Sequence, residues 1–341
     1  MSLTFACELA AEPLTALFAD GTVIDRLRAL DAGVSLGLLD LSPERAEVVR
    51  RLNAAGVPVI AWLLLPESEG YWCNADNGPR VVARYAAFQA WTADEALVWD
   101  GIGLDIEPDI ALMEQLVKGA VHKIVPRLLP NLFDRERVLR AQAIYTTLVT
   151  QMHLDGYCVE SYQFPFILDE RRVGTTLLQR LLGIVDVAVD HEVVMLYSSM
   201  MGQAAPSILW SYGQDVATHG GGIGIGSTGG GVDLAVDFPP LTWSEFTRDL
   251  DLARQLTDDV FIFSLEGCVR RGFLDWLAKL EVPADVEAPQ EAQVAMAPAV
   301  QTARRVFRGM LWVGAHPLQI AGMVMGSAAL VWLLRRHPRR A

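Results

Sequence analysis

The sequence predicts an α/β protein, a (β/α)8 barrel followed by a C-terminal transmembrane helix. Short apolar runs rich in β-branched residues alternate with amphipathic helical stretches eight times, which is typical of parallel βαβ units. Eight such units within about 280 residues fit a closed barrel better than an open doubly wound sheet. After Leu280 the composition changes, and a linker-like stretch precedes a long run without charges.

Eight segments have the length and composition of barrel strands. The first lies at the N-terminus, where MSLTFACELAAEP lacks the basic start of an export signal and fits a strand. The expected strands are Leu3–Glu8, Val34–Leu39, Pro58–Leu64, Gly101–Glu107, Gly156–Tyr162, Val193–Tyr197, Gly222–Ser227 and Val260–Leu265.

Helices are expected between the strands. Pro43–Ala55 shows the full pattern, with Ser42 as N-cap and Gly56 as the stop signal. The segment Ile110–His153 is long for one connection, so we expect it to hold two helices that form a lid or a wall of the cleft. The other expected helices are Arg80–Trp91, Thr175–Ile184, Ala205–His219, Trp243–Gln255 and Gly272–Leu280.

The chain is expected to divide into a catalytic barrel (1–282), a linker (283–303) and a basic-flanked membrane helix (304–341). Residues 302–341 carry seven arginines and no acid, and the whole chain carries −13, so residues 1–301 carry −20. The 26 residues 309–334 lack Asp, Glu, Lys and Arg, enough to cross a core of about 30 Å with tilt. We expect a single-pass anchor and favour a barrel in the cytoplasm, while the opposite orientation stays open. A partner-binding or in-plane helix is the alternative to an anchor.

The charge balance argues against nucleic acid as a partner, because phosphate binding needs a basic patch on the folded domain. The cysteines, Cys7, Cys73, Cys158 and Cys268, show neither close pairs nor metal-ligand spacing, and the six histidines are scattered. We therefore expect no metal and no cofactor.

Barrels of this type carry their chemistry at the C-terminal ends of the strands. Most of the expected strand ends carry an acid or a phenol, an unusual density for a face that only needs to be soluble. These strand-end residues are Glu8, Asp40, Asp105, Glu107, Glu160, Tyr162, Gln163, Tyr197, Ser227 and Glu266.

The strongest feature is the exit of the fourth strand, WDGIGLDIEPD at residues 99–109. The strand period places Asp105 and Glu107 on one side, at the exit of the barrel core. Two carboxylates at i and i+2 crowd each other, so one tends to keep a proton near neutral pH, as a general acid requires. A strand-end pair that caps the next helix or bonds an arginine is the structural alternative.

The segment DGIGLDIEP (residues 100–108) resembles the fourth-strand signature D-G-x-D-x-D-x-E of family 18 glycoside hydrolases, with Gly103 in place of the first inner Asp. The resemblance implies a chitinase-type barrel in which Glu107 protonates the leaving oxygen and Asp105 orients an attacking N-acetyl group. Tyr197 is similar to the Tyr of the sixth-strand Met-x-Tyr-Asp, which supports that intermediate. In another glycosidase arrangement, Glu266 or Glu160 would be the nucleophile opposite Glu107.

Two loops add candidate binding groups. Tyr71 and Trp72 lie among polar residues, where flat rings suit stacking on a sugar; a small apolar cluster is the alternative. The glycine-rich stretch 219–231 contains G-x-G-x-x-G at the end of the seventh strand, where many barrels bind phosphate through backbone N–H groups. A flexible rim loop explains the glycines equally well.

We therefore predict a glycoside hydrolase acting on a carbohydrate, such as an N-acetylhexosamine-containing envelope glycan or a glycolipid. Two other functions stay open: a barrel enzyme acting on a phosphorylated or lipid-linked sugar or a phosphodiester, and a non-catalytic glycan-binding barrel. The predicted catalytic residues are Glu107, Asp105, Tyr197, Glu266 and Glu160. The predicted substrate-binding residues are Glu8, Asp40, Trp62, Tyr71, Trp72, Tyr162, Gln163 and Ser227.

Overall fold

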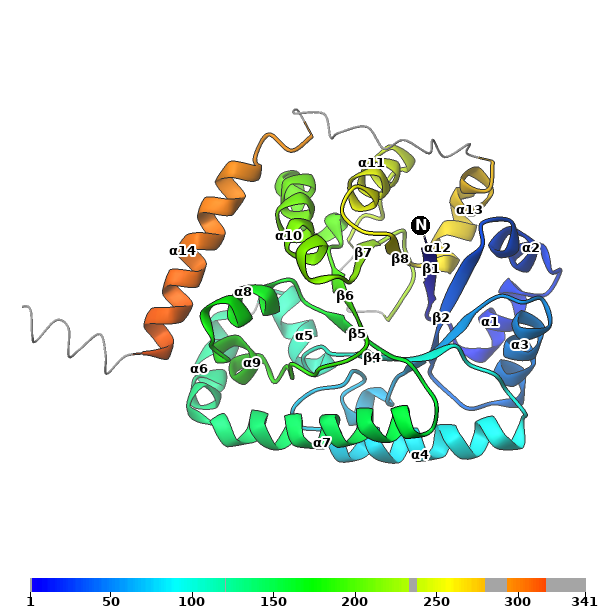
Figure 1. Cartoon of the computed structure of the whole chain (residues 1–341), viewed down its shortest axis with the longest axis horizontal. Coiled ribbons are helices and arrows are strands. Elements are labelled where there is room, and N and C mark those ends of the chain that lie inside the picture. Colours follow the sequence, from blue (N-terminus) through cyan, green and yellow to red (C-terminus); the bar gives the residue numbers. More distant parts are fainter. Residues whose placement is uncertain (1, 120, 233–237, 280–292, 317–341) are drawn as a thin grey trace, which may run out of the picture.

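The computed structural model describes residues 2–119, 121–232, 238–279 and 293–316. Eight parallel strands form a closed barrel in which each strand pairs with the next and β8 pairs with β1. The predicted (β/α)8 barrel is confirmed, and Figure 1 shows the helices arranged around the strands. The strands are β1 (Ser2–Cys7), β2 (Ala32–Leu38), β3 (Val59–Leu63), β4 (Gly101–Asp105), β5 (Val159–Gln163), β6 (His191–Met195), β7 (Gly222–Gly226) and β8 (Asp259–Phe263).

All eight strands lie where the sequence predicts them, with small differences at their ends. The largest concerns β5, which was expected from Gly156 and begins at Val159. Gly156 has a left-handed backbone with φ +92°, and its N–H donates to the carbonyl of His153. A glycine in this position commonly ends a helix, so the chain is still leaving the preceding helix at the point where the strand was expected.

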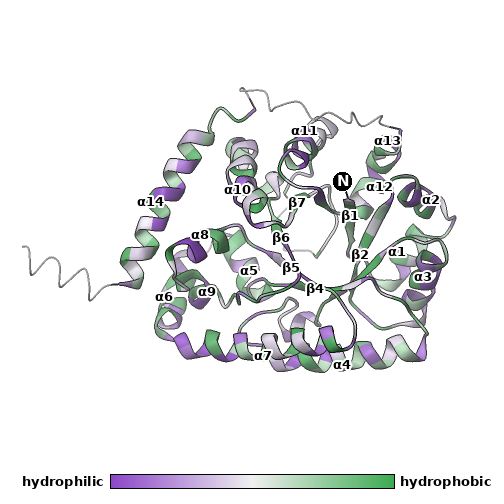
Figure 2. Ribbon diagram, in the orientation of Figure 1, coloured by the Kyte–Doolittle hydropathy of each residue, from purple (hydrophilic) through white to green (hydrophobic). Residues whose placement is uncertain are grey.

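The helices connect successive strands, and Figure 2 shows hydrophobic colouring along the strands and mixed bands along the helices, as for helices with one buried face. The helices before the fourth strand are α1 (Ala11–Leu17), α2 (Thr22–Ala29), α3 (Pro43–Ala54) and α4 (Gly78–Asp94). Those after it are α5 (Ile110–Val117), α6 (Val121–Leu128), α7 (Arg135–Leu154), α8 (Phe166–Val173), α9 (Leu177–Leu182), α10 (Ala205–His219), α11 (Trp243–Arg254), α12 (Leu265–Arg270), α13 (Phe273–Leu277) and α14 (Ala297–Ala315).

Local signals explain where several helices begin. The Ser42 hydroxyl accepts from the backbone N–H of Arg45 at 3.3 Å, as predicted for an N-cap, and proline at position 43 opens α3. In α11, Thr242 and Glu245 form a capping box, which satisfies two N–H groups at the helix start.

The long segment between β4 and β5 holds more structure than the two helices we expected. It contains α5, α6, the 3-10 turn η2 (Leu129–Phe133) and the long α7. Pro130 lies in η2 and Asp134 caps α7, so the chain is interrupted between α6 and α7. Among the described residues of this segment, only Met113 and Val117 on α5 line the cavity described below, so the segment provides part of its wall.

Glycines on β4 and β7 make room for two tyrosines inside the barrel. A β-carbon on Gly103 would lie 2.6 Å from the hydroxyl of Tyr162, and one on Gly224 would lie 3.3 Å from the ring of Tyr197. The glycine-rich sequences of these strands, GIGLD and GIGIG, therefore follow from packing in the barrel interior.

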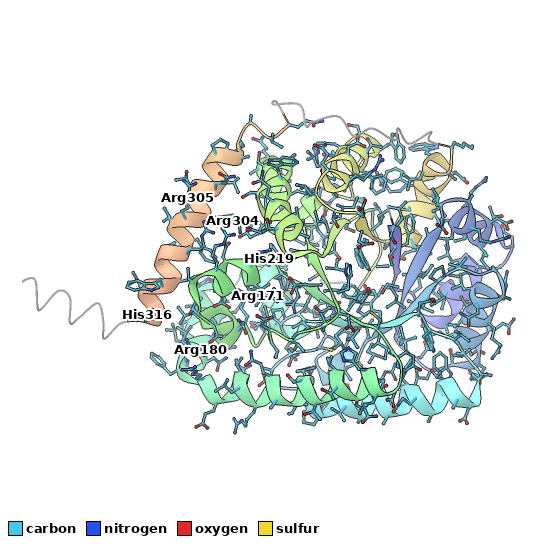
Figure 3. The ribbon with its side chains drawn as sticks, in the orientation of Figure 1. Arg171, Arg180, His219, Arg304, Arg305 and His316 are labelled. Carbon is cyan, nitrogen blue, oxygen red and sulfur yellow. The ribbon has the colours of Figure 1, made fainter. Side chains whose placement is uncertain are left out.

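The last described helix, α14, packs against the outside of α8 and α10. Arg304 is buried there: it pairs with Asp169 at 2.8 Å, contacts Asp215 and stacks over Tyr212 at 3.6 Å. Arg304 lies on the side of α14 that faces the barrel (Figure 3). Residues 297–303 were expected in the linker and residues 304–315 in the membrane helix, but both form this docked helix.

The greater part of the expected membrane helix, residues 317–341, lies outside the described residues. Within the described ranges, no helix combines the length and the apolar character needed to cross a membrane. The structure therefore leaves the predicted anchor as a prediction from the sequence.

Candidate active site

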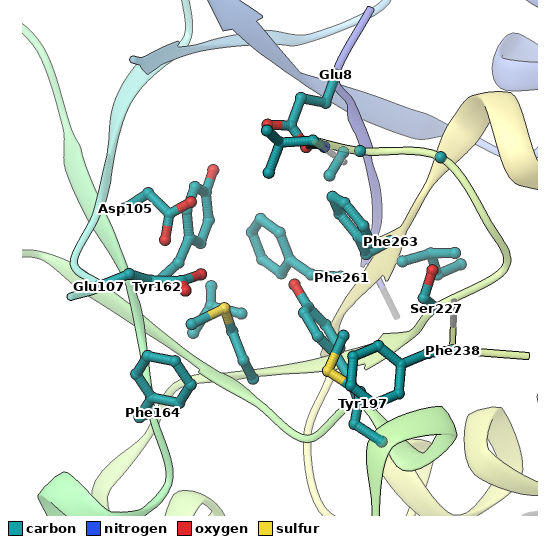
Figure 4. Close-up of a pocket in the computed structure, with 18 of the residues that line it drawn as sticks. Glu8, Asp105, Glu107, Tyr162, Phe164, Tyr197, Ser227, Phe238, Phe261 and Phe263 are labelled. Atoms are coloured by element: carbon teal, nitrogen blue, oxygen red, sulfur yellow. Dashed lines mark hydrogen bonds between the residues drawn. The ribbon is translucent and has the colours of Figure 1, made fainter. Parts of the chain in front are cut away.

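A cavity of about 810 Å³ opens at the C-terminal ends of the strands. Three acidic side chains line it: Glu8 follows β1, Asp105 ends β4, and Glu107 lies just beyond β4. Figure 4 shows Asp105 and Glu107 side by side on one wall and Glu8 on another. The volume lies within the range of roughly 300–1,000 Å³ typical of small-molecule sites.

The backbone around the acid pair is held by a second segment of chain. Cys73 forms an isolated parallel bridge with Ile106: its N–H donates to the carbonyl of Asp105 at 2.8 Å, and its carbonyl accepts from the N–H of Glu107 at 3.2 Å. This bridge continues the strand geometry past β4. Ile106 is buried away from the cavity while Asp105 and Glu107 line it, which confirms that the strand period places both acids on one side.

The acid pair favours the protonated state. Burial raises the pKa of Glu107 to about 8, and the negative charge of Glu8 adds to this effect. Burial also raises the pKa of Asp105 well above its usual value, and the charges of Glu107 and Glu8 contribute. Asp105 is only 3% exposed, and its Oδ1 has no hydrogen-bond partner among the described residues. The site thus holds at least one carboxylic proton at neutral pH.

Glu8 is the third acid of the cavity. Burial raises its pKa to about 7, although hydrogen bonds from the hydroxyl of Tyr71 and the N–H of Val232 oppose that rise. The Val232 N–H donates to Oε2 of Glu8 at 3.1 Å. Glu8 is therefore partly ionised near neutral pH and could act as a base or a stabilising charge.

Two tyrosines add polar groups to the cavity. Tyr197 follows β6, stacks on Phe263 with ring centroids 5.5 Å apart, and its hydroxyl end points into the cavity (Figure 4). Burial and the charges of Asp105 and Glu107 raise the pKa of Tyr197, so its hydroxyl stays protonated and can donate a hydrogen bond. Tyr162 also lines the cavity, but its hydroxyl is engaged with Glu160 and Ser35, each at 2.5 Å.

Two of the three aromatic residues Trp62, Tyr71 and Trp72, which were expected to contact the substrate, line the cavity. Trp62 and Trp72 line the cavity, which places both predicted residues where a substrate can reach them. Tyr71 packs edge-on against Trp72, with centroids 5.2 Å apart, and is not among the cavity-lining residues. Its role in the structure is to hold the Glu8 carboxylate.

Glu160 lies away from this cavity. It lines a smaller cavity of about 290 Å³ at the N-terminal end of the barrel, together with His191 and Asp259. The reason is the late start of β5, which makes Glu160 the second residue of the strand rather than one near its end. The structure therefore does not bring Glu160 to Glu107, so it cannot be the opposing nucleophile.

Asp40 and Gln163 also fall outside the cavity lining. Burial would raise the pKa of Asp40, but hydrogen bonds from Arg45 and Ser42 outweigh it and lower the pKa to about 2. Asp40 forms an ion pair with the fully buried Arg45 at 2.9 Å and thus holds the loop after β2. Gln163 is fully buried at the end of β5.

Glu266 packs against the glycine-rich loop and lies outside the cavity lining. β8 ends at Phe263, Ser264 caps α12, and this turn buries Glu266 away from the cavity lining. A side chain at Gly230 would collide with the Glu266 carboxylate, and one at Gly231 would lie 2.9 Å from Oε2 of Glu8.

The glycine-rich loop lines the cavity through Ser227 and Gly229–Gly231. Several N–H groups in and beside this loop are already used: that of Ser227 donates to Ser199 at 2.8 Å, that of Gly229 donates to Ser227 at 3.0 Å, and that of Val232 donates to Glu8. Two acids beside this loop repel a phosphate, which argues against the phosphate-binding interpretation.

The side chains that the sequence analysis missed are mostly apolar. They come from segments that follow the strands and form the outer part of the cavity wall, where Arg270 is the only cation among the described lining residues. The only local signal for them was Phe-Pro-Phe at 164–166, directly after β5. The apolar residues of this outer wall are Met113, Val117, Phe164, Phe166, Met200, Met201, Val232, Phe238 and Pro240.

No family model matches the chain, and no curated protein matches it. Among solved structures, it is similar to the PgaB (BpsB) glycoside hydrolase domain from Bordetella bronchiseptica, with 12% identity, a TM-score of 0.49, and coverage of 81% of this chain and 97% of that one. It is also similar to an L-ribulose 3-epimerase (12% identity, TM-score 0.40, coverage 95% and 97%). A third is a modular endo-beta-1,4-mannanase from Cellulomonas fimi (11% identity, TM-score 0.37, coverage 75% and 66%).

Proposed function

We propose that the barrel is a glycoside hydrolase in which Glu107 is the general acid and Asp105 is its partner. The observation that carries the proposal is the Asp105–Glu107 pair in the wall of a substrate-sized cavity, with Asp105 buried and the pKa of Glu107 raised to about 8. A strand-end pair with a structural role would be neutralised by an arginine or by a helix cap, and among the described residues no arginine pairs with either acid.

In the proposed reaction, the Glu107 proton passes to the glycosidic oxygen. The bond between that oxygen and the anomeric carbon breaks, and its electron pair goes to the leaving oxygen. Water then adds to the anomeric carbon and returns a proton to Glu107. A substrate bearing an N-acetyl group would be assisted by Asp105 and Tyr197, as the resemblance to family 18 implies.

The alternative functions have less support from the site. A phosphate-directed enzyme would need the glycine-rich loop as an anion site, and Glu8 and Glu266 lie beside that loop. A non-catalytic glycan-binding barrel would have no need for an acid held at a pKa of about 8. In glycosidase chemistry, Glu8 would replace Glu160 and Glu266 as the carboxylate facing Glu107.

The deciding experiment compares Glu107→Gln with wild type on 4-nitrophenyl glycosides and alkyl glycosides of the same sugars, with and without N-acetyl groups. A general acid contributes about 10²–10⁴-fold, and it matters most for a poor leaving group. Activity should therefore fall far more on alkyl than on nitrophenyl substrates. Glu67→Gln, an exposed glutamate outside the cavity, is the control. Equal loss on both substrate types, or no hydrolysis by wild type, would contradict the proposal.

We also propose that the chain is tethered to a membrane beyond α14, with the barrel on the cytoplasmic side. Because Arg304 is docked on the barrel, we assign the membrane tether to Leu318–Leu334, a stretch without charged residues. As a helix, this stretch would span about 25 Å at about 1.5 Å per residue. Protease protection of both termini in intact cells tests the orientation, since digestion of the barrel from outside would reverse it.

A further inference from the structure

We infer that the outer part of the cavity binds an alkyl or acyl chain, so that the substrate is an amphiphilic glycoside with its sugar at the acids. The inference rests on the proposed function for calling this ligand a substrate, but the chain-binding surface stands on its own geometry. We call this surface the rim and define it as Met113, Val117, Phe164, Phe166, Met200 and Met201.

The rim is assembled from three successive connections. Met113 and Val117 lie on α5 after β4, Phe164 and Phe166 lie at the start of α8 after β5, and Met200 and Met201 follow β6. The rings of Phe164 and Phe166 stack with centroids 5.5 Å apart and planes 12° apart, which forms a flat wall. These connections leave the barrel at its C-terminal end, so the rim lies outside the level of the acids.

The opposite wall is apolar as well. Val232, Phe238 and Pro240 come from the connection after β7 and line the same cavity. In Figure 4, Phe164 and Phe238 lie on different sides of the space in front of Tyr197. The part of a bound ligand that extends outward from the acid pair thus contacts apolar side chains on both sides.

Glu8, Asp105, Glu107 and Tyr197 lie at the strand ends, whereas the six rim side chains are thioethers and hydrocarbons. Arg270, the cation of the outer wall, lies on α12 after β8 and is not part of the rim. A sugar hydroxyl placed at the rim would lose water without gaining a hydrogen bond, which is unfavourable. One sugar unit at the acids and an apolar group at the rim therefore match the distribution of the lining residues. A second sugar at the rim does not.

Methionines give the rim room to adapt. Met200 is 46% exposed although it lines the cavity, and Met113 and Met201 are partly exposed. An apolar ligand would cover this surface, and flexible thioethers can pack against chains of varying shape. The occupant we propose is thus a flexible hydrocarbon chain, rather than a rigid ring system that would need one fixed pocket shape.

The test measures binding of methyl, butyl, hexyl and octyl β-N-acetylglucosaminides to the full chain carrying Glu107→Gln, below micelle concentrations. Burial of a methylene group is worth about fourfold in affinity, so Kd should fall about fourfold for each added methylene group that the rim covers. Adding Met113→Gln and Met200→Gln should reduce the octyl-to-methyl affinity ratio by about tenfold or more.

The matched control is Met310→Gln, an equally conservative change at a 61% exposed methionine on α14, outside the cavity. An unchanged melting temperature for the double variant shows that the loss is local. Affinity that does not depend on chain length, no binding of any probe, or a chain-length dependence that survives the rim substitutions overturns the inference. Chain-length-dependent binding with no hydrolysis by wild type would contradict the proposed function alone and leave the rim as a binding site.

Discussion

The hydroxyl of Tyr162 fills the space beside Gly103, where a β-carbon would lie only 2.6 Å from the hydroxyl oxygen. That hydroxyl also donates to Glu160 and contacts Ser35, each at 2.5 Å. The residue that departs from the family 18 pattern is therefore explained by packing. A glycine is needed at position 103 because Tyr162 on the neighbouring strand fills the space beside it. The phenol of Tyr162 thus occupies the place that a side chain at position 103 would take.

This contact makes Gly103→Ala a test of the interior packing. The added methyl must displace Tyr162 or the backbone of β4, so we expect the free energy of unfolding to fall by about 1–3 kcal/mol, as for other overpacked cores. Urea denaturation measures it. Gly309→Ala is the control, because nothing lies within 4 Å of a β-carbon there and the site is helical. If Gly103→Ala left the free energy of unfolding unchanged, Tyr162 would be able to move aside without cost.

The fold was largely predictable because its signals are local. Each strand is a short apolar run next to an amphipathic helix, and the alternation survives errors of a few residues at the ends. The strand boundaries were less accessible. The chain turns out of α7 at Gly156, so β5 begins only at Val159, and Glu160 is its second residue, away from the mouth of the barrel.

The site was predictable only where its residues are neighbours in the sequence. Asp105 and Glu107 are two residues apart on one strand, so the strand period alone places them together. Glu266 was misplaced because Ser264 starts α12 directly after β8 and turns the acid behind the glycine-rich loop. The apolar rim comes from separate connections, and no periodicity in one segment indicates that they converge.

The rate of hydrolysis should depend on pH through Glu107. A general acid must carry its proton, so kcat/KM should decline as the pH rises through about 8, the pKa of Glu107. The charge of Glu8 contributes to that raised pKa, so Glu8→Gln should move this decline to lower pH. A pH profile of both proteins on an alkyl glycoside measures the shift. A decline that stays at the same pH in Glu8→Gln would contradict the assigned coupling.

Stability should fall as the pH rises through the same range. Glu8 and Glu107 have folded-state pKa values of about 7 and 8, above the usual value of 4.5. The folded protein then binds more protons than the unfolded chain between pH 4.5 and 8. The contribution of these groups is complete below about 4.5 and is lost as the pH rises through their folded pKa values.

Melting curves at about pH 5.5 and 8.5 test this dependence. Glu8→Gln should raise stability at the higher pH by about 1–3 kcal/mol, because it removes the need to bury an ionised carboxylate. The same substitution should have a smaller effect at the lower pH, where the folded-state Glu8 carries its proton. Glu67→Gln controls for the loss of one surface charge. If Glu8→Gln lowers stability at both pH values, the carboxylate is held by favourable contacts rather than strained by burial.

Arg304 tests whether α14 belongs to the folded barrel. Its guanidinium pairs with Asp169, which is fully buried, and stacks on Tyr212. Arg304→Met leaves the Asp169 charge buried with weaker pairing, and breaking such a pair typically costs about 3–5 kcal/mol. Because α14 is the last described helix and packs on one side of the barrel, the cost should appear as undocking of this helix.

Trypsin should then cut after Arg305 and Arg308 much faster than in wild type, since cleavage requires local opening. Arg305→Met, at an exposed neighbour, should leave cleavage after Arg308 unchanged. Equal cleavage rates after Arg308 in all three proteins would mean that α14 is not held by this ion pair. Faster cleavage in Arg304→Met alone would extend the folded unit to residue 315 and confine any membrane tether to the residues beyond it.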